Sequence, residues 1–174
     1  ALIVKFMANY FFNPASYPVV GLQDQPAHDA FLFRQGPAKG LGQIRFHDYG
    51  PILSAADLPN ARVFREQMET FKMLLAMATP DEAQQRDVDF LLALGEIFTL
   101  AVYGQLILEA AAIHGVDADT LDQILDVMVR DVTRYAVQLY GKPSSTAAQM
   151  DFCLKMIRKP ILDEGRFGRV WQQV

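Results

Sequence analysis

One segment constrains the fold of this chain more than any other: a predominantly apolar stretch from Phe90 to Ile113. Thr79-Pro80-Asp81-Glu82 precedes it and is typical of a capping box, with proline at the first helical position and glutamate three residues after the cap. Gly115 follows it and is a typical helix stop. We therefore expect one long helix from Thr79 to Gly115. A helix that is apolar on all sides is either the axis of a helical bundle or a membrane span.

The apolar segment is long enough for a membrane span, but its carboxylates favour the bundle. Glu96 and Glu109 lie inside the segment with Gln105 between them, and carboxylates are costly in lipid. No basic flank marks a cytoplasmic end. The sequence therefore predicts a central bundle helix and leaves open only a peripheral contact with a membrane.

Further capped helices precede and follow this segment. We expect them at Leu2–Phe12, Asn60–Ala78, Asp117–Gly141, Ser145–Arg158 and Asp163–Gln173. The turn before the long helix is short, so that helix and the one preceding it should be antiparallel neighbours. We therefore predict an all-α fold, an antiparallel up-and-down helical bundle.

The periodicity also predicts which side chains face the core. The Asp117–Gly141 helix carries an apolar stripe with i, i+3, i+4, i+7 spacing. The members of this stripe are Leu121, Ile124, Leu125, Met128, Val132, Tyr135, Ala136 and Leu139. In the following helix we expect Phe152, Met156 and Ile157 to point inward.

The N-terminal part of the chain has a different character. Residues 13–27 contain three prolines and residues 36–42 are rich in glycine, so both predict loops, with a short helix around His28–Phe33 between them. Over residues 43–49 polar and apolar side chains alternate, as is typical of an extended segment. We therefore divide the chain into an N-terminal helix with an irregular Pro/Gly-containing arm, residues 1–52, and a helical bundle, residues 53–174. Because the chain begins without Met and within a helical pattern, we expect it to be a piece of a longer protein.

Charge and cysteine content limit the classes of function. Residues 1–52 carry four Lys/Arg against three Asp/Glu, and residues 53–174 carry twelve against seventeen. This balance lacks the basic face that nucleic-acid binding requires. The single cysteine, Cys153, cannot form an internal disulfide, and no secretion signal is recognisable, so we expect a reducing, cytoplasmic location. Cys153 lies in an apolar helix and is expected to pack in the core.

The sequence contains no catalytic or metal-binding constellation. A di-iron bundle needs Glu-x-x-His motifs on two helices, and His28, His47 and His114 have no such spacing. Thirteen residues separate Glu96 from Glu109, which turns the two side chains to different sides of a helix. No serine or cysteine has the surroundings of a nucleophile. We therefore predict no catalytic residue and no metal site in this chain.

The glycine cluster of the arm is the candidate binding site. Its glycines would let backbone amides approach an anion, and nearby basic side chains would supply charge. The cluster matches neither a Walker loop nor a dinucleotide fingerprint, and a loop whose glycines only permit turns is the alternative. The candidate phosphate or pyrophosphate contacts, taken as cofactor-binding residues, are Arg34, Lys39, Gly40, Gly42 and Arg45.

Helix order and hydrophobic pattern carry a family resemblance. The segments Val63–Leu75, Phe90–Leu100 and Leu121–Val132 follow one another in an order that resembles the C-terminal helical extension of large, very-long-chain type acyl-CoA dehydrogenases. Phe31–Gly36 falls where that family passes from its last core helix into a glycine-containing loop near the flavin. Arg34-Gln35-Gly36-Pro37 stands in place of the family's Tyr-Glu-Gly-Thr loop.

The resemblance implies a parent enzyme that oxidises an acyl-CoA thioester at its α and β carbons and passes a hydride to FAD. It assigns no catalytic glutamate here, because Glu96 and Glu109 fall in the extension rather than in the core. The chain would then be a non-catalytic domain with a structural or assembly role, within a homo-oligomer or a larger parent chain. The alternative is a free-standing helical binding or dimerisation module with a hydrophobic ligand pocket.

Overall fold

The computed structural model describes residues 2–16 and 44–173, and these residues form seven helices and no strand. The predicted all-α fold is confirmed. The chain divides into two units, Leu2–Asp48 and Tyr49–Val174. The division that we predicted from sequence, between residues 52 and 53, falls within helix α2 (Gly50–Ala55), a short helix that the sequence pattern did not reveal.

The unit Leu2–Asp48 is built from helix α1 (Leu2–Phe12) and an extended segment at residues 44–48. The Tyr10 ring lies edge-on to Phe46, with 5.5 Å between ring centroids. Asn9 Nδ2 donates to the Ile44 carbonyl at 2.7 Å, and the amide of Ala15 donates to the Phe46 carbonyl at 2.8 Å. The predicted helix is confirmed. In the predicted extended segment, His47 forms an isolated bridge to Ala15, but Tyr49 already has helical backbone angles, so the segment ends before residue 49. The helix expected around His28–Phe33 lies outside the described residues.

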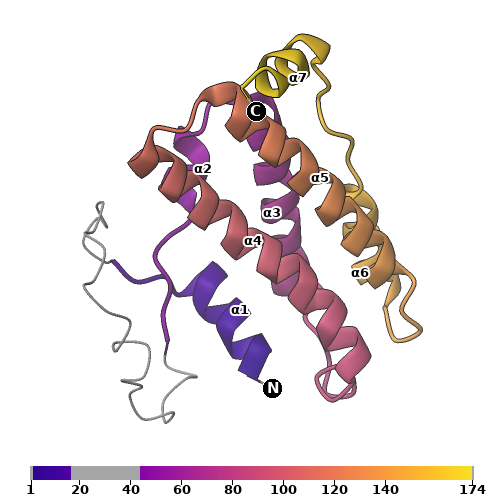
Figure 1. Cartoon of the computed structure of the whole chain (residues 1–174). Coiled ribbons are helices and arrows are strands. Elements are labelled where there is room, and N and C mark those ends of the chain that lie inside the picture. Colours follow the sequence, from indigo (N-terminus) through magenta and orange to yellow (C-terminus); the bar gives the residue numbers. More distant parts are fainter. Residues whose placement is uncertain (1, 17–43, 174) are drawn as a thin grey trace, which may run out of the picture. The chain divides into compact units, whose positions relative to one another are not determined.

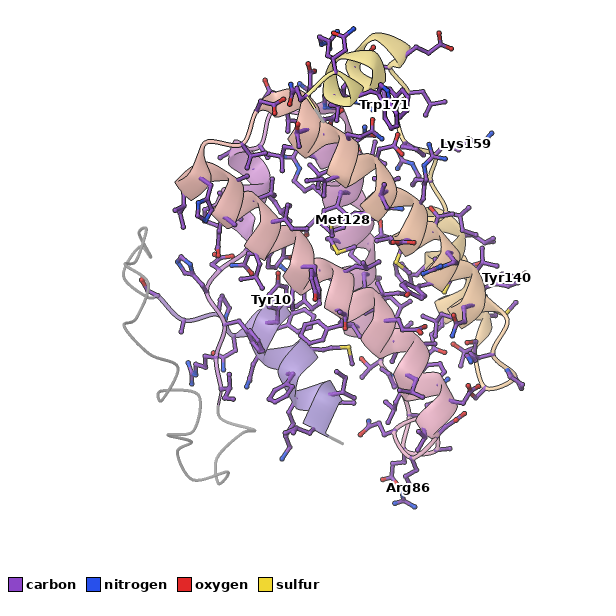
Figure 2. All side chains as sticks on the ribbon, viewed as in Figure 1. Tyr10, Arg86, Met128, Tyr140, Lys159 and Trp171 are labelled. Atoms are coloured by element: carbon purple, nitrogen blue, oxygen red, sulfur yellow. The ribbon has the colours of Figure 1, made fainter. Side chains whose placement is uncertain are left out.

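The unit Tyr49–Val174 contains α2 and five further helices. They are α3 (Pro59–Met77), α4 (Val88–His114), α5 (Ala118–Tyr140), α6 (Ala147–Met156) and α7 (Glu164–Trp171). Helices α3 to α6 run alternately up and down (Figure 1). Figure 2 shows Arg86 in the turn at one end of this bundle and Trp171 at the other end. The up-and-down order that we predicted is therefore observed. The expectation that α3 and α4 pack side by side along their length after a short turn is wrong, because ten residues connect them and α3 packs mainly on α5 and α6.

Helix α5 holds the central position that we expected for the apolar helix. It packs along α3, α4 and α6, and α7 packs on it near its start. Helices α3 and α5 run in the same direction and in register. Asn60 contacts Asp122, and seven residues later Gln67 donates to the Val129 carbonyl at 3.1 Å. In both pairs the two partners are 62 residues apart in the sequence, so the two helices lie side by side in one alignment along this length.

The apolar helix α4 begins later than its sequence signal predicts. Thr79 does not cap it; the Thr79 hydroxyl donates back to the Leu75 carbonyl at 2.9 Å, at the end of α3. The cap of α4 is Asp87, whose Oδ1 accepts from the amides of Asp89 and Phe90 at 3.0 and 3.2 Å. Gly115, with φ of 66°, ends the helix as predicted.

The other helix starts divide into confirmed and wrong predictions. Asp117 caps α5 and Asp163 caps α7, as predicted. Asn60 does not cap α3; Leu58 precedes Pro59 at that start, and the Asn60 side chain is fully buried. Helix α6 begins with Thr146, which forms a capping box with Gln149.

The predicted core is largely correct, with two exceptions. Most of the α5 stripe is buried, but Ile124 is exposed, and Asp122, Asp126 and Val129 are buried instead. Phe152 and Met156 face inward as predicted. Ile157 is exposed because α6 ends at Met156 and the chain turns away from the helical path. Cys153 is fully buried, as expected of a packing residue.

Candidate functional site

The predicted phosphate site cannot be assembled from the described residues. Arg34, Lys39, Gly40 and Gly42 lie outside them. Arg45 is exposed in the unit Leu2–Asp48, where its Nη1 donates to Asn13 Oδ1 at 3.2 Å. The phosphate contact therefore stays a prediction.

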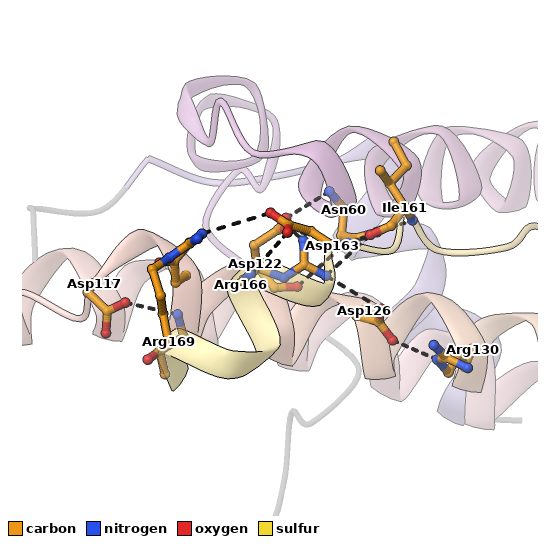
Figure 3. A network of polar contacts seen from close by, with 11 residues as sticks. Asn60, Asp117, Asp122, Asp126, Arg130, Ile161, Asp163, Arg166 and Arg169 are labelled. Carbon is orange, nitrogen blue, oxygen red and sulfur yellow. Dashed lines mark hydrogen bonds and ion pairs between the residues drawn. The ribbon is translucent and has the colours of Figure 1, made fainter. Parts of the chain in front are cut away.

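The most unusual group of side chains in the bundle is a buried polar cluster that sequence reasoning missed. We name it the arginine cluster; its members are Asn60 of α3, Asp122 and Asp126 of α5, and Arg166 of α7 (Figure 3). All four residues are buried. Polar side chains are buried in this way only where hydrogen bonds or opposite charges compensate for the lost water. The contacts of the cluster supply both.

Asn60 connects three segments that are far apart in the chain. Its backbone amide donates to Asp122 Oδ1 at 2.8 Å, and its Nδ2 donates to Asp122 Oδ2 at 3.0 Å. The amide of Ile161 donates to Asn60 Oδ1 at 2.8 Å, and Asn60 Nδ2 also donates to the Ile161 carbonyl at 3.2 Å. One carboxamide thus joins the start of α3, the start of α5 and the segment that leads to α7.

Arg166 supplies the positive charge of the cluster. Its Nη1 pairs with Asp122 Oδ2, and its Nη2 lies 3.6 Å from Asp126 Oδ2 and donates to the Ile161 carbonyl at 3.2 Å. Arg130 Nε donates to the other oxygen of Asp126 at 2.6 Å from a half-exposed position. The hydrogen bond to Asp126 raises the pKa of Arg130. Two carboxylates therefore face two guanidinium groups, and the buried charge is balanced.

An ion pair at the rim extends the cluster to the surface. Arg169 Nη2 donates to Asp119 Oδ1 at 2.8 Å, and the same guanidinium lies 3.8 Å from Asp163. The hydrogen bond between Arg169 and Asp119 lowers the pKa of the Asp119 carboxyl and raises the pKa of the Arg169 guanidinium. Both partners of this pair are partly exposed, so its contribution to stability is small.

A second polar feature is an open groove of about 640 Å³ between α3 and the end of α6. Charged side chains form most of its lining. They are Arg65, Glu66, Glu69, Lys155 and Arg158. Arg158 Nη1 lies 2.7 Å from Glu66 Oε2, and the hydroxyl of Tyr49 donates to Glu69 Oε1 at 3.0 Å. Arg158 and Glu66 therefore form an ion pair across the groove, whereas Glu69 is bonded to a tyrosine hydroxyl rather than to a positive charge.

The two glutamates of α4 have separate surroundings. Glu109 Oε1 accepts from Gln105 Nε2 at 2.8 Å, whereas Glu96 Oε2 is buried without a hydrogen-bond partner among the described residues. In the described ranges, 2–16 and 44–173, no group of three His, Cys, Asp or Glu side chains is arranged to hold a metal ion. Within those same ranges, α4 is the one helix long and apolar enough to cross a membrane, and half of its most apolar window is buried in the protein.

The chemistry of the arginine cluster is recognition of a guanidinium group by carboxylates and carbonyl oxygens. Neither a family model, nor a curated protein, nor a solved structure matches this chain.

Proposed function

We propose that this chain is a non-catalytic helical assembly domain, of the kind that follows the flavin-binding core in large acyl-CoA dehydrogenases. Its direct role is to join copies of itself or to join a larger parent chain. FAD and acyl-CoA belong to the proposed parent enzyme. The candidate residues for flavin contact lie mainly outside the described part of the chain.

An apolar stripe on α4 is the observation that carries the assembly role. Val88, Leu92, Tyr103 and Leu106 are each more than half exposed. At 100° per residue their side chains fall within about 60° of one another around the helix axis. Thr99 lies in the same sector, and no charged residue of α4 does. An uncharged apolar stripe on a helix surface is typical of a protein–protein contact.

The surroundings of the buried polar groups also support a role without catalysis. The carboxylates and amides of the arginine cluster bond to one another, which leaves them engaged in holding helices together. The groove between α3 and α6 is open and five charged side chains line it, so it does not form the enclosed pocket that the alternative of a hydrophobic ligand module requires.

The assembly role is tested by the molar mass of the intact chain in solution. We expect light scattering after size exclusion to report a dimer or larger species. The double variant Leu92→Lys/Leu106→Lys should return the monomer. Val137→Lys, which changes an exposed apolar side chain on α5 outside the stripe, is the matched control and should keep the wild-type mass. A monomeric wild type, alone and with its parent chain, would refute the assembly role.

The link to a flavoenzyme needs a separate measurement. We expect the protein isolated from its source to be part of a longer chain with a flavin absorbance band and acyl-CoA-dependent bleaching of that band. A colourless protein that nevertheless assembles through the stripe would refute the dehydrogenase parent and leave the assembly role intact.

A further inference from the structure

Helix α7 is attached to the bundle by one buried polar side chain together with contacts at the surface. Arg166 is the one buried residue of α7, with 3% of its surface exposed. The apolar Phe167 and Trp171 are 57% and 72% exposed and stack on each other, 6.3 Å between ring centroids. Surface helices normally dock by burying an apolar face. Helix α7 instead docks by inserting a guanidinium between the carboxylates of α5.

The other contacts of α7 are too weak to hold it alone. The Arg169–Asp119 pair is at the surface, where ion pairs contribute little. The hydrogen bond between Thr120 and Gln173 is long, at 3.4 Å, and exposed. The segment 157–163 that leads to α7 is not helical, so its release breaks no helix of the bundle, although it breaks the two hydrogen bonds between Ile161 and Asn60.

Arg166 also fits its pocket incompletely. Its Nη1 and Nη2 are engaged, but its Nε is buried without a hydrogen-bond partner among the described residues. A buried donor without a partner carries a desolvation penalty, which release of the helix into water would remove. Release would also hydrate Asp122 and Asp126, so the bundle would not be left with a buried unpaired charge.

We infer that Asn60, Asp122 and Asp126 form a guanidinium-binding pocket, and that α7 is a releasable strap that fills this pocket with its own Arg166. The strap opens while helices α3 to α6 stay folded. The open pocket takes the guanidinium group of an arginine side chain, held by two carboxylates in the planar geometry that favours arginine over lysine. Asn60 positions Asp122 for this contact through its amide and Nδ2.

Trp171 is the single tryptophan of the chain and lies on α7, so it reports the strap directly in the full-length protein. In Arg166→Met we expect the fluorescence anisotropy of Trp171 to fall by roughly half, because a released helix moves on the nanosecond timescale. Circular dichroism should still melt cooperatively within a few degrees of the wild-type Tm. Arg169→Met is the matched control on the same helix and should keep the wild-type anisotropy.

Two outcomes would overturn the strap. One is a variant that keeps its anisotropy until global unfolding; the other is a variant that fails to fold or melts far below the wild type. Either would make α7 an integral part of the bundle.

The ligand class is tested on the same variant by nuclear magnetic resonance. Methylguanidinium should shift the Asn60 side-chain amide signal in a saturable way, and methylammonium at the same concentration should shift it at least about tenfold less. Equal shifts by the two cations, or none, would refute a guanidinium pocket.

Discussion

The ring of Phe64 occupies the space that a β-carbon on Gly104 would fill. A Cβ built on Gly104 would lie 2.3 Å from Cε1 of Phe64 and 2.5 Å from its Cζ. Phe64 is fully buried on α3, and Gly104 is in the middle of α4. The glycine is therefore required by the approach of these two helices rather than by backbone conformation.

This contact predicts that Gly104→Ala destabilises the protein although alanine favours helices. Alanine would gain about 1 kcal/mol in helix propensity. Forcing the buried Phe64 ring to move should cost about 1–3 kcal/mol, as overpacked cores do, and the short 2.3 Å approach places this cost above the gain. Chemical denaturation followed by circular dichroism measures the difference. Gly168→Ala, where a Cβ would meet nothing within 4 Å, is the control and should not destabilise. Equal stability of Gly104→Ala and wild type would contradict the contact.

The sequence predicted which segments are helical better than it predicted where each helix begins. The stops at Gly115 and the caps at Asp117 and Asp163 depend only on neighbouring residues, and all three are correct. Thr79-Pro80-Asp81-Glu82 failed because Gln84 competes for the same turn. The amide of Gln84 donates to Asp81 Oδ1 and its side chain accepts from the Asp81 amide, so the chain makes a local turn there. Asp87 then starts the helix afresh.

The arginine cluster could not be predicted because its partners are distant in sequence. Asp122 and Asp126 follow helical spacing, but a carboxylate on an amphipathic helix is normally assigned to the solvent face. Only the docking of Asn60 from α3 and Arg166 from α7, 62 and 44 residues away from Asp122, makes burial of that carboxylate favourable. No local pattern carries this information. The candidate phosphate residues of the arm, by contrast, remain untested apart from the position of Arg45.

The reciprocal pair Gln84 and Gln149 predicts strong energetic coupling between a turn and a helix. Each amide donates to the other's oxygen, at 2.8 and 3.0 Å, and both side chains are buried. Either single change to alanine should cost about 1–3 kcal/mol, because it leaves buried amide groups unsatisfied. The double variant should be less destabilised than the sum of the two by about 1 kcal/mol or more. Additive effects in this double-mutant cycle would mean that the two side chains do not act as a pair.

The Cys153 thiol should be inert in the folded protein. It is fully buried, and burial raises the pKa of this thiol to about 12. Since the thiolate is the reactive form, reaction with DTNB at pH 8 should follow the rate of protein unfolding rather than the reagent concentration. The double variant Val137→Cys/Cys153→Ser, with a thiol at an exposed position of α5 outside the α4 stripe, is the accessible reference and should react at once. Rapid labelling of Cys153 under native conditions would show that this part of the core opens readily.

The cap of α4 predicts how stability changes in acid. Hydrogen bonds from the Phe90 amide and then from the Ser144 hydroxyl lower the pKa of Asp87 below its ordinary value of 3.8. A carboxyl whose pKa is lower in the folded state stabilises the protein when ionised. This contribution is complete above pH 3.8 and is lost as the pH falls through the lower folded value. Asp87→Asn should therefore have a lower Tm than wild type at pH 7, and the difference should shrink below about pH 4. Ser144→Ala, which removes one of the three donors to Asp87, should show the same trend with a smaller amplitude. A difference in Tm that stays constant from pH 7 to the acid limit of folding would mean that the charge of Asp87 does not stabilise the start of α4.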